Sequence, residues 1–162
     1  MPNVFEPEFD DAEERAGFVS RQAQLGRQAH AKRLGASLYE LPPGQTTFPY
    51  HWHVANEEML IVLRGAVDLR GPDGWRAVNE GEVIAFPRGE RGAHQMRNRG
   101  DDAVRFLVIS EMRGPEVVVY PDSGKVGARE LAPGTPGDAL RLNFRADDAV
   151  DYWEGEQPPE TR

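Results

Sequence analysis

The chain has 162 residues, no cysteine and a hydrophobic fraction of 39%, which is enough to build the core of one ordinary domain. The absence of cysteine excludes disulfide bonds and thiolate metal sites, so any bound metal needs nitrogen and oxygen ligands. The sequence contains no apolar run of about 18 residues and no basic start followed by an apolar stretch. We therefore expect a cytoplasmic protein without a membrane span or a secretory signal.

The net charge of −8 is concentrated at the two ends of the chain. Residues 1–15 contain six acidic side chains and one arginine, and residues 145–162 contain six acidic side chains and two arginines. The region between these ends is close to neutral. This distribution predicts solvated, partly mobile termini in preference to a specific acidic docking tail.

One basic cluster stands out in the first part of the chain. Its members are Arg21, Arg27, His30, Lys32 and Arg33. Phe18 is the only aromatic residue nearby, and no nucleic-acid-binding module is recognisable. We expect a solvated face or a subunit contact here, and neither nucleic acid nor a membrane among the partners.

The secondary structure changes in character along the chain. Residues 10–16, DDAEERA, place carboxylates where they would complement the dipole of a short helix, so we predict a helix there. From Leu34 onward, short apolar runs are bounded by glycine, proline and polar pairs. This spacing predicts an all-β sandwich or barrel. Because no internal repeat is visible, we expect one barrel.

The sequence after the last long apolar run predicts an extension. Residues 140–144 (LRLNF) form a candidate short returning strand, and beyond them Tyr152 and Trp153 are the only large aromatics. We expect this pair to pack on its own barrel or on a neighbouring subunit, with a substrate lid as the alternative. The predicted organisation is an N-terminal arm (1–33), a barrel (34–120) and a C-terminal extension (121–162).

A histidine pair provides the first chemical signal. In an extended segment side chains alternate between two faces, so His51 and His53 point to one side and Trp52 points to the other. After a short turn the next strand begins with Glu57 and Glu58, and alternation allows either of them to join the histidines. Imidazole suits Zn, Cu, Fe and Ni, and carboxylate also accommodates Mn, so the pattern indicates a transition-metal site.

A third imidazole follows in a later strand. His94, Met96 and Asn98 alternate onto one face, and His94 joins the histidine pair if its strand lies beside theirs. The fourth histidine, His30, is expected to be structural or exposed. Asn98 is expected to be a hydrogen-bonding residue of a turn or strand end.

Two segments closely resemble the two signature motifs of the cupin superfamily. The first is GQTTFPYHWHVANEEMLIVLRG, and its motif residues are Gly44, His51, His53, Glu58 and Gly65. The second is GEVIAFPRGERGAHQMRN, and its motif residues are Gly81, Pro87, Gly89, His94 and Asn98. The chain departs from the family in one extra residue between Gly44 and His51, and in four residues, 90–93, where the family usually has two.

The resemblance covers residues 34–120 and implies an all-β cupin fold, a double-stranded β-helix or jelly-roll barrel. It selects Glu58 over Glu57 and implies that His51, His53, Glu58 and His94 hold a divalent Fe, Mn, Ni or Zn ion. The closest likeness is to small bacterial single-domain cupins. Since cupin barrels commonly pair through outer strands and terminal arms, the resemblance also implies a homodimer.

The reaction stays open at this point, because the superfamily contains dioxygenases, decarboxylases, isomerases and epimerases as well as binding and storage proteins. Our hypothesis is a metal-dependent enzyme acting on a small polar molecule such as a sugar derivative, keto acid or phenol. The alternatives are a non-catalytic binding or sensing cupin and a cupin whose metal only stiffens the barrel. Candidate residues of the pocket wall are Tyr39, Tyr50, Phe86, Gln95, Met96 and Arg105.

Overall fold

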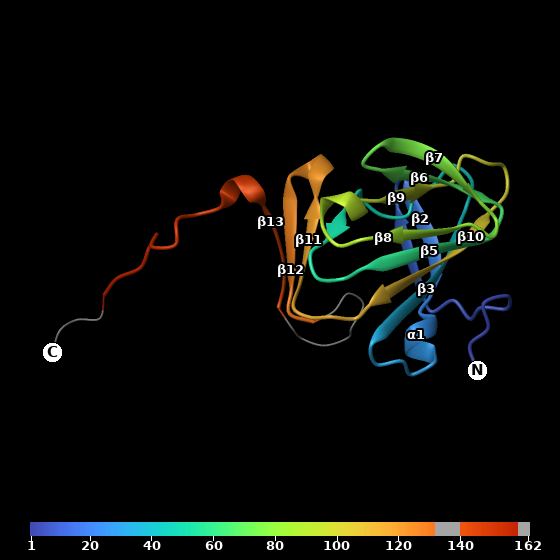
Figure 1. The fold of residues 1–162 in the computed structure, drawn as a ribbon, viewed down its shortest axis with the longest axis horizontal. Coiled ribbons are helices and arrows are strands. Elements are labelled where there is room, and N and C mark those ends of the chain that lie inside the picture. Colours follow the sequence, from blue (N-terminus) through green and yellow to red (C-terminus); the bar gives the residue numbers. More distant parts are fainter. Residues whose placement is uncertain (132–139, 159–162) are drawn as a thin grey trace.

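The computed structural model describes residues 1–131 and 140–158, and its strands form an antiparallel all-β barrel (Figure 1). The largest sheet has six strands in the order β1 (Asp11–Arg15), β2 (Phe18–Ala23), β3 (Leu34–Leu41), β10 (Val104–Glu111), β5 (Glu58–Arg64) and β8 (Val83–Phe86). This architecture confirms the predicted jelly-roll fold class.

Two smaller sheets complete the barrel. One has the order β13 (Arg141–Arg145), β12 (Lys125–Arg129), β11 (Glu116–Tyr120) and β4 (Trp52–His53). The other has the order β7 (Gly74–Asn79), β6 (Ala66–Gly71) and β9 (Gln95–Arg97). Strand β13 confirms the predicted returning strand; residues 132–139 and 159–162 of the predicted C-terminal extension lie outside the described residues.

In residues 1–131 and 140–158, helical structure is limited to short turns. These are α1 (Leu25–Gln28) and the 3-10 turns Glu90–Gly92, Pro121–Ser123 and Ala146–Asp148. Within the described ranges, no helix is long and apolar enough to span a membrane.

The predicted helix over residues 10–16 is wrong. This segment is strand β1, which pairs with β2 from Asp11 opposite Gln22 to Arg15 opposite Phe18, with Gly17 at a positive φ of 81° in the turn. An isolated helix this short is unstable, whereas the hairpin satisfies the backbone groups against a neighbouring strand. Since β2 also pairs with β3, part of the predicted N-terminal arm extends the main sheet.

The apolar core fills the inside of the barrel. On β5 and β10, Leu60 lies opposite Val108 and Val62 lies opposite Phe106, and three of these four side chains are almost completely buried. Each fully buried side chain of this size stabilises the fold by about 1.5–3 kcal/mol. Glu58 precedes Leu60 on the same face of β5, so the core and the polar site described below share a strand.

The outer face of the six-stranded sheet carries a smaller apolar cluster. Ala23, Leu25 and Leu38 are buried there, and Val4 and Phe9 of the N-terminal segment pack against them. The N-terminal residues therefore cover this face of the sheet.

Candidate metal centre

Three short elements bring the predicted ligands together at one end of the core. His53 lies in β4, Glu58 is the first residue of β5, and His51 and His94 lie opposite each other in an isolated antiparallel bridge. The backbone N–H of His94 donates to the carbonyl of His51 at 2.9 Å, and that of His51 donates to the carbonyl of His94 at 3.2 Å. This bridge fixes the two imidazoles side by side although they lie far apart along the chain.

The side-chain donor atoms converge. Nε2 of His51 and Nε2 of His53 are 3.1 Å apart, and Oε2 of Glu58 lies 3.5 Å from Nε2 of His53 and 3.2 Å from Nε2 of His94. Ligand atoms of His51, His53 and Glu58 all lie within 4.8 Å of one another. His94 is not one of this group of three, but its Nε2 adjoins the carboxylate of Glu58 at the edge of the group.

Backbone carbonyls fix the tautomers of two imidazoles. Nδ1 of His51 donates to the carbonyl of Pro49, and Nδ1 of His94 donates to the carbonyl of Gly92, both at 2.9 Å. Because a carbonyl only accepts hydrogen bonds, each Nδ1 carries the proton and each neutral ring keeps the lone pair of Nε2 available. This arrangement is typical of metal-ligating histidines, whose second nitrogen is held by an outer hydrogen bond.

The lengthened loop of the second motif contributes directly to this arrangement. Residues 90–92 form a 3-10 turn, and the carbonyl of Gly92 receives the hydrogen bond from His94. A Cβ at Gly92 would lie 1.8 Å from the carbonyl oxygen of Pro87, so only glycine fits this close approach. The two extra residues relative to the family pattern thus leave His94 at the site.

Glu116 supports His53 from behind, and sequence reasoning missed it. Its side chain is fully buried, with Oε2 lying 3.4 Å from Nδ1 of His53. The backbone N–H groups of Val54 and Ala55 donate to Oε1, and Nδ2 of Asn56 donates to Oε2. The only sequence signal was an isolated carboxylate at the start of the apolar run EVVVY.

The chemistry of these donors fits a metal ion. The buried Nε2 of His94 has no hydrogen-bond partner among the described residues, despite its proximity to Glu58. An unpaired buried nitrogen of this kind is costly unless another group satisfies it. Three imidazoles and one carboxylate are ligands that Fe, Mn, Ni and Zn accept.

Comparison with known proteins identifies the family. Residues 37–110, which contain all four candidate ligands, match the family model of the cupin domain. The polyketide cyclase RemF from Streptomyces resistomycificus is 30% identical, with a TM-score of 0.52 over 65% of this chain and 70% of that protein. The chain belongs to the cupin superfamily.

Two further structures resemble this cupin over most of its length. A putative sugar phosphate isomerase from Acidithiobacillus ferrooxidans is 24% identical, with a TM-score of 0.74 over 86% of each chain. A sugar phosphate isomerase of the cupin superfamily from Silicibacter pomeroyi is 23% identical, with a TM-score of 0.76 over 92% of this chain and 94% of that one. At these identities the likeness shows the fold alone. None of the curated proteins compared with the chain matches it.

Charge and burial set the protonation states of this cupin's polar cluster. Burial alone would raise the pKa of Glu58, but the adjacent imidazoles of His94, His53 and His51 outweigh it and lower the pKa to about 2. Burial and the neighbouring His94 and His53 lower the pKa of His51 to about 3. Near neutral pH Glu58 is therefore ionised and His51 is neutral, which are the forms that bind a metal.

His53 and Glu116 form a second electrostatic pair. Burial opposes the charged form of His53, but the carboxylates of Glu116 and Glu58 outweigh it and raise the pKa. Burial likewise opposes ionisation of Glu116, but His53 and the N–H donors of Ala55 and Asn56 lower its pKa. Glu116 is therefore a buried carboxylate stabilised by donors from the loop between β4 and β5.

Aromatic rings enclose the imidazoles. Phe86 stacks on His94 with ring centroids 4.0 Å apart and an interplanar angle of 11°. Phe48, which sequence reasoning missed, presents its edge to His51 at 4.9 Å and to His94 at 5.7 Å. These rings keep water away from one side of the site.

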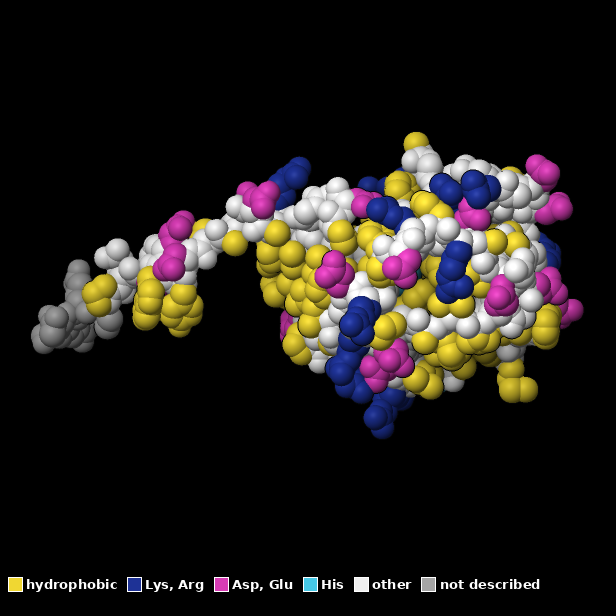
Figure 2. All heavy atoms as spheres, turned by 45° about the horizontal axis from the view of Figure 1, so that its top comes forward, with side chains coloured by type: hydrophobic (Ala, Val, Ile, Leu, Met, Phe, Trp, Pro, Cys, Tyr) yellow, Lys and Arg dark blue, Asp and Glu magenta, His cyan; other side chains and the backbone are white. Residues whose placement is uncertain are grey.

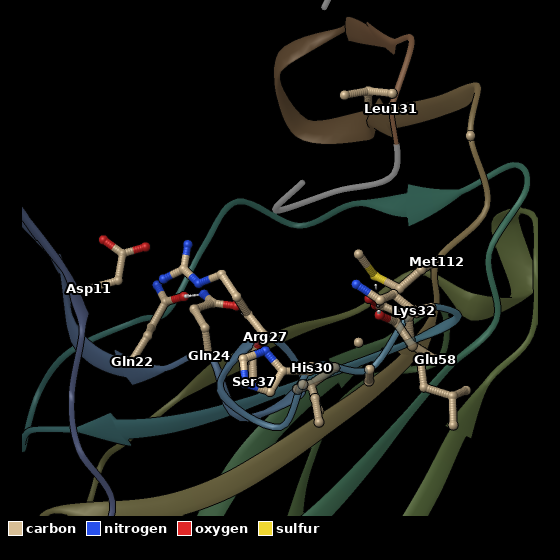
Figure 3. A pocket seen from close by; sticks show the side chains of 18 of the residues that line it. Asp11, Gln22, Gln24, Arg27, His30, Lys32, Ser37, Glu58, Met112 and Leu131 are labelled. Atoms are coloured by element: carbon tan, nitrogen blue, oxygen red, sulfur yellow. Dashed lines mark hydrogen bonds between the residues drawn. The ribbon is translucent and has the colours of Figure 1, made fainter. Parts of the chain in front are cut away.

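A pocket of about 810 Å³ opens beside Glu58 (Figure 3). Its inner wall includes polar side chains of β2, β3 and β10 and of the residue following β2. These are Gln22, Gln24, Ser37, Tyr39 and Ser110. Figure 3 shows Gln22 and Gln24 on one side, and Glu58 with Lys32 and Met112 on the other. A volume of this size is ordinary for a small-molecule site.

Two of the six predicted wall residues lie at the site or the pocket. Tyr39 lines the pocket and stacks on Phe106 at 5.3 Å, and Phe86 contacts His94. Burial and the charge of Glu58 raise the pKa of Tyr39, so its hydroxyl stays protonated and is available as a hydrogen-bond donor. Met96 is completely buried in the barrel core and makes no pocket wall.

The other three predicted wall residues lie elsewhere. Arg105 is on the outer face of the main sheet, where it pairs with Glu40 at 2.7 Å. Gln95 donates from Nε2 to the carbonyl of Phe48, and the ring of Tyr50 lies 4.1 Å beneath the guanidinium of Arg70. The prediction that Arg105 and Gln95 line the pocket is wrong. Side chains alternate along a strand, and it is their neighbours Phe106 and His94 that point inward.

The remaining predicted roles concern single residues. Nδ2 of Asn98 donates to the carbonyls of Leu41 and Asp102, which is the expected structural role. His30 is exposed, and it lines the outer part of the pocket. Glu57 is exposed and its backbone N–H contacts Glu111, so Glu58 alone of the two neighbouring glutamates faces the histidines.

Proposed function

We propose that this cupin is a metal-dependent enzyme acting on a small polar molecule. A divalent Fe, Mn, Ni or Zn ion would be held by Nε2 of His51, His53 and His94 and by the carboxylate of Glu58. The observation that carries this proposal is the close group of His51, His53 and Glu58, with Nε2 of His94 beside Glu58, while backbone carbonyls hold Nδ1 of His51 and His94. Such outer hydrogen bonds are typical of metal-ligating histidines.

The bound metal would supply Lewis-acid catalysis at a substrate oxygen or, if it is iron, oxygen activation. The protein's own groups would orient the substrate. Glu58 links the ligand cluster to the pocket, where Gln24 accepts a hydrogen bond from Ser37 and donates one to Gln22. Such amide and hydroxyl groups match the hydroxyls of a polyhydroxylated molecule, and the protonated Tyr39 adds a donor.

This wall favours a sugar derivative among the candidate substrates. The names of two structural neighbours make sugar phosphate isomerisation the first reaction to test, followed by oxidation of phenols and decarboxylation of keto acids. A non-catalytic binding cupin is the second candidate. It is favoured by the same wall, since the amide and hydroxyl groups of Gln22, Gln24, Ser37 and Ser110 bind ligands without transferring protons readily.

The test is a turnover assay with aldose and ketose phosphates, phenols and keto acids, after loading the protein separately with Fe(II), Mn(II), Ni(II) and Zn(II). We expect turnover with at least one metal and substrate class, and its loss in His53→Ala. The control is Glu57→Ala, which removes an exposed side chain beside Glu58 that lines neither the ligand cluster nor the pocket. If calorimetry detects ligand binding but no metal and substrate combination gives turnover, the enzyme proposal is wrong and the chain is a binding protein.

A further inference from the structure

The basic cluster in the first part of the chain divides between two places in the fold. Arg21 points to the outer face of the main sheet, where it pairs with Glu40. Arg27, His30 and Lys32 instead line the pocket that opens beside the ligand cluster. Three members of the basic cluster therefore belong to the candidate substrate pocket.

The pocket differs in chemical character between its two ends. Its inner end holds Glu58, and the wall beyond it carries uncharged amide and hydroxyl groups. Figure 3 shows Arg27 and His30 between Gln22 on one side and Lys32 with Glu58 on the other. The three basic residues are exposed, so they lie at the mouth. A molecule that fills the pocket therefore meets the ligand cluster at one end and basic side chains at the other.

The pocket also has three acidic residues, none of which pairs with the basic ones. They are Asp11, Glu58 and Glu130. Oε2 of Glu130 accepts a hydrogen bond from the backbone N–H of Leu140 at 3.0 Å. Within the described part of the chain, neither His30 nor Lys32 forms an ion pair. Their polar groups are therefore available to a ligand.

Arg27 is held in place by Asp10. Oδ2 of this carboxylate accepts a hydrogen bond from Nη2 of Arg27 at 3.0 Å, and Oδ1 accepts one from the backbone N–H of Gln24 at 2.9 Å. Gly26 packs so closely on β3 that a Cβ there would lie 2.9 Å from the backbone nitrogen of Ala36. Helix α1 is therefore fixed on the sheet, and Arg27 keeps its remaining guanidinium N–H groups as donors for an anion.

His30 occupies a backbone position that usually belongs to glycine. At the end of α1 the N–H of Ala31 donates to the carbonyl of Gly26, and the N–H of His30 donates to the carbonyl of Arg27, both at 2.9 Å. This is the Schellman pattern, in which the residue after the cap is left-handed. His30 has a φ of 60°, and no other non-glycine residue in the described ranges has a positive φ. Glycine adopts this conformation with less strain, so a histidine here indicates a role of the imidazole other than stabilising the fold.

The acidic C-terminal arm, residues 146–158, does not offset the charge at the mouth. Its five carboxylates are carried on a segment that leads away from the barrel (Figure 2), and none of its residues lines the pocket. Tyr152 is 82% exposed and Trp153 is 71% exposed, so their expected packing on their own barrel is not found among the described residues. The net charge of −8 therefore does not describe the charge around the pocket.

We propose that Arg27, His30 and Lys32 bind the phosphate group of a phosphorylated sugar derivative whose other end lies at the ligand cluster. This assignment rests on the proposed function, because it places one end of the substrate in the same pocket. A phosphate monoester carries a charge of about −1.5 to −2 near pH 7 and three strong acceptor oxygens. A guanidinium, an ammonium and an imidazole N–H match these three acceptors, whereas a carboxylate has only two oxygens.

Calorimetric titration with glucose, glucuronate and glucose 6-phosphate, which differ only at carbon 6, tests the assignment. We expect glucose 6-phosphate to bind at least about tenfold more tightly than glucose, with glucuronate between them. Lys32→Gln should weaken the binding of glucose 6-phosphate about tenfold, because it removes one charged donor. The matched control is Arg33→Gln, which removes the same charge one residue away but does not line this pocket, so it should keep the wild-type affinity.

His30→Gly separates a binding role from a structural one. It should weaken the binding of glucose 6-phosphate about tenfold and leave the Tm unchanged or raised, because glycine suits a positive φ. A lower Tm with unchanged affinity would show that His30 only supports the fold, and would overturn its part in the proposal.

His53→Ala separates failure of this assignment from failure of the proposed function. The variant should lose turnover and still prefer glucose 6-phosphate to glucose, because the basic side chains do not depend on the ligand cluster. Wild-type protein that prefers glucose 6-phosphate without any turnover supports the phosphate site and contradicts the enzyme.

Three results overturn the phosphate site whatever the turnover assay gives. The first is wild-type protein that binds glucose 6-phosphate no more tightly than glucose at up to about 10 mM. The second is tighter binding of glucuronate than of glucose 6-phosphate. The third is an equal loss of affinity in Lys32→Gln and Arg33→Gln.

Discussion

The apolar core and the histidine cluster are neighbours inside one barrel, yet they satisfy different requirements. On β5, Leu60 and Val62 point into the core, and Glu58 on the same face points to His53 and His94. Burial of the two apolar side chains stabilises the fold directly. Burial of the carboxylate and imidazoles costs free energy unless another group compensates for it.

Strand alternation therefore buries both kinds of side chain on the same face of β5, but only the apolar ones are there to stabilise the fold. Folding alone accounts for the core. It does not account for Nε2 of His94, which has no hydrogen-bond partner in the described part of the chain. A bound metal ion would satisfy this nitrogen, and Glu116 would then orient His53 as one of its ligands.

Phe106→Ala should produce the largest change in stability. Phe106 is fully buried in the core, so its removal leaves a cavity and should lower the free energy of unfolding by about 3–5 kcal/mol. Urea denaturation of the variant and of the exposed control Val83→Ala measures this difference. A loss below about 1 kcal/mol would mean that the core is not packed as described.

Glu116→Gln should act on the site and spare the core. Glutamine keeps the volume and can still accept hydrogen bonds from Val54 and Ala55, but it lacks the charge beside His53 and turns its Nε2 toward the donor Nδ2 of Asn56. We expect metal affinity to fall about 10- to 100-fold, and the free energy of unfolding to fall by about 1–3 kcal/mol because of the two facing donors. Competitive titration against a chromophoric chelator measures the affinity, and Glu111→Gln serves as the exposed-carboxylate control. Equal metal affinities for the two variants would show that Glu116 does not support the metal site.

The free energy of unfolding of the metal-free protein should depend on pH through His51, and this effect should be smaller than those of the two substitutions above. The pKa of His51 falls from its ordinary 6.5 to about 3 in the folded protein. Between these values the unfolded chain binds a proton that the folded chain does not, so stability is lost as the pH falls. The loss attributable to His51 is at most about 1.4 kcal/mol per pH unit.

Comparison of the wild type with His51→Gln isolates this contribution to the stability profile. We expect the variant to lose less stability than the wild type when urea denaturation is followed from pH 6.5 down to the acid limit of folding. His30→Gln, which changes an exposed histidine, should keep the wild-type slope. Identical slopes for all three proteins would contradict the assignment of a buried, neutral His51.

Much of the fold and of the site could be predicted because both follow from short-range patterns. Alternation placed His51 and His53 on one face, and motif spacing chose Glu58 over Glu57. Short apolar runs separated by turn residues predicted the barrel. These signals lie within segments of about 20 residues, so one sequence is sufficient to recognise them.

The errors arose where long-range pairing decides the outcome. Residues 11–15 form a strand because β2 lies beside them, which local helix signals do not reveal. Arg105 faces outward because the pairing of β10 with β3 and β5 turns its neighbour Phe106 toward the core. Glu116 reaches His53 only because β11 pairs with β4, which is distant in sequence. Such registers depend on tertiary contacts and not on local sequence.

Elemental analysis of protein purified without added metal tests the central claim most directly. We predict about one divalent transition-metal ion per chain in the wild type, and strong loss of metal in His53→Ala while the His30→Ala control keeps it. Wild-type protein that carries no transition metal and binds none on titration, or a His53→Ala variant that retains full metal content, would contradict the account.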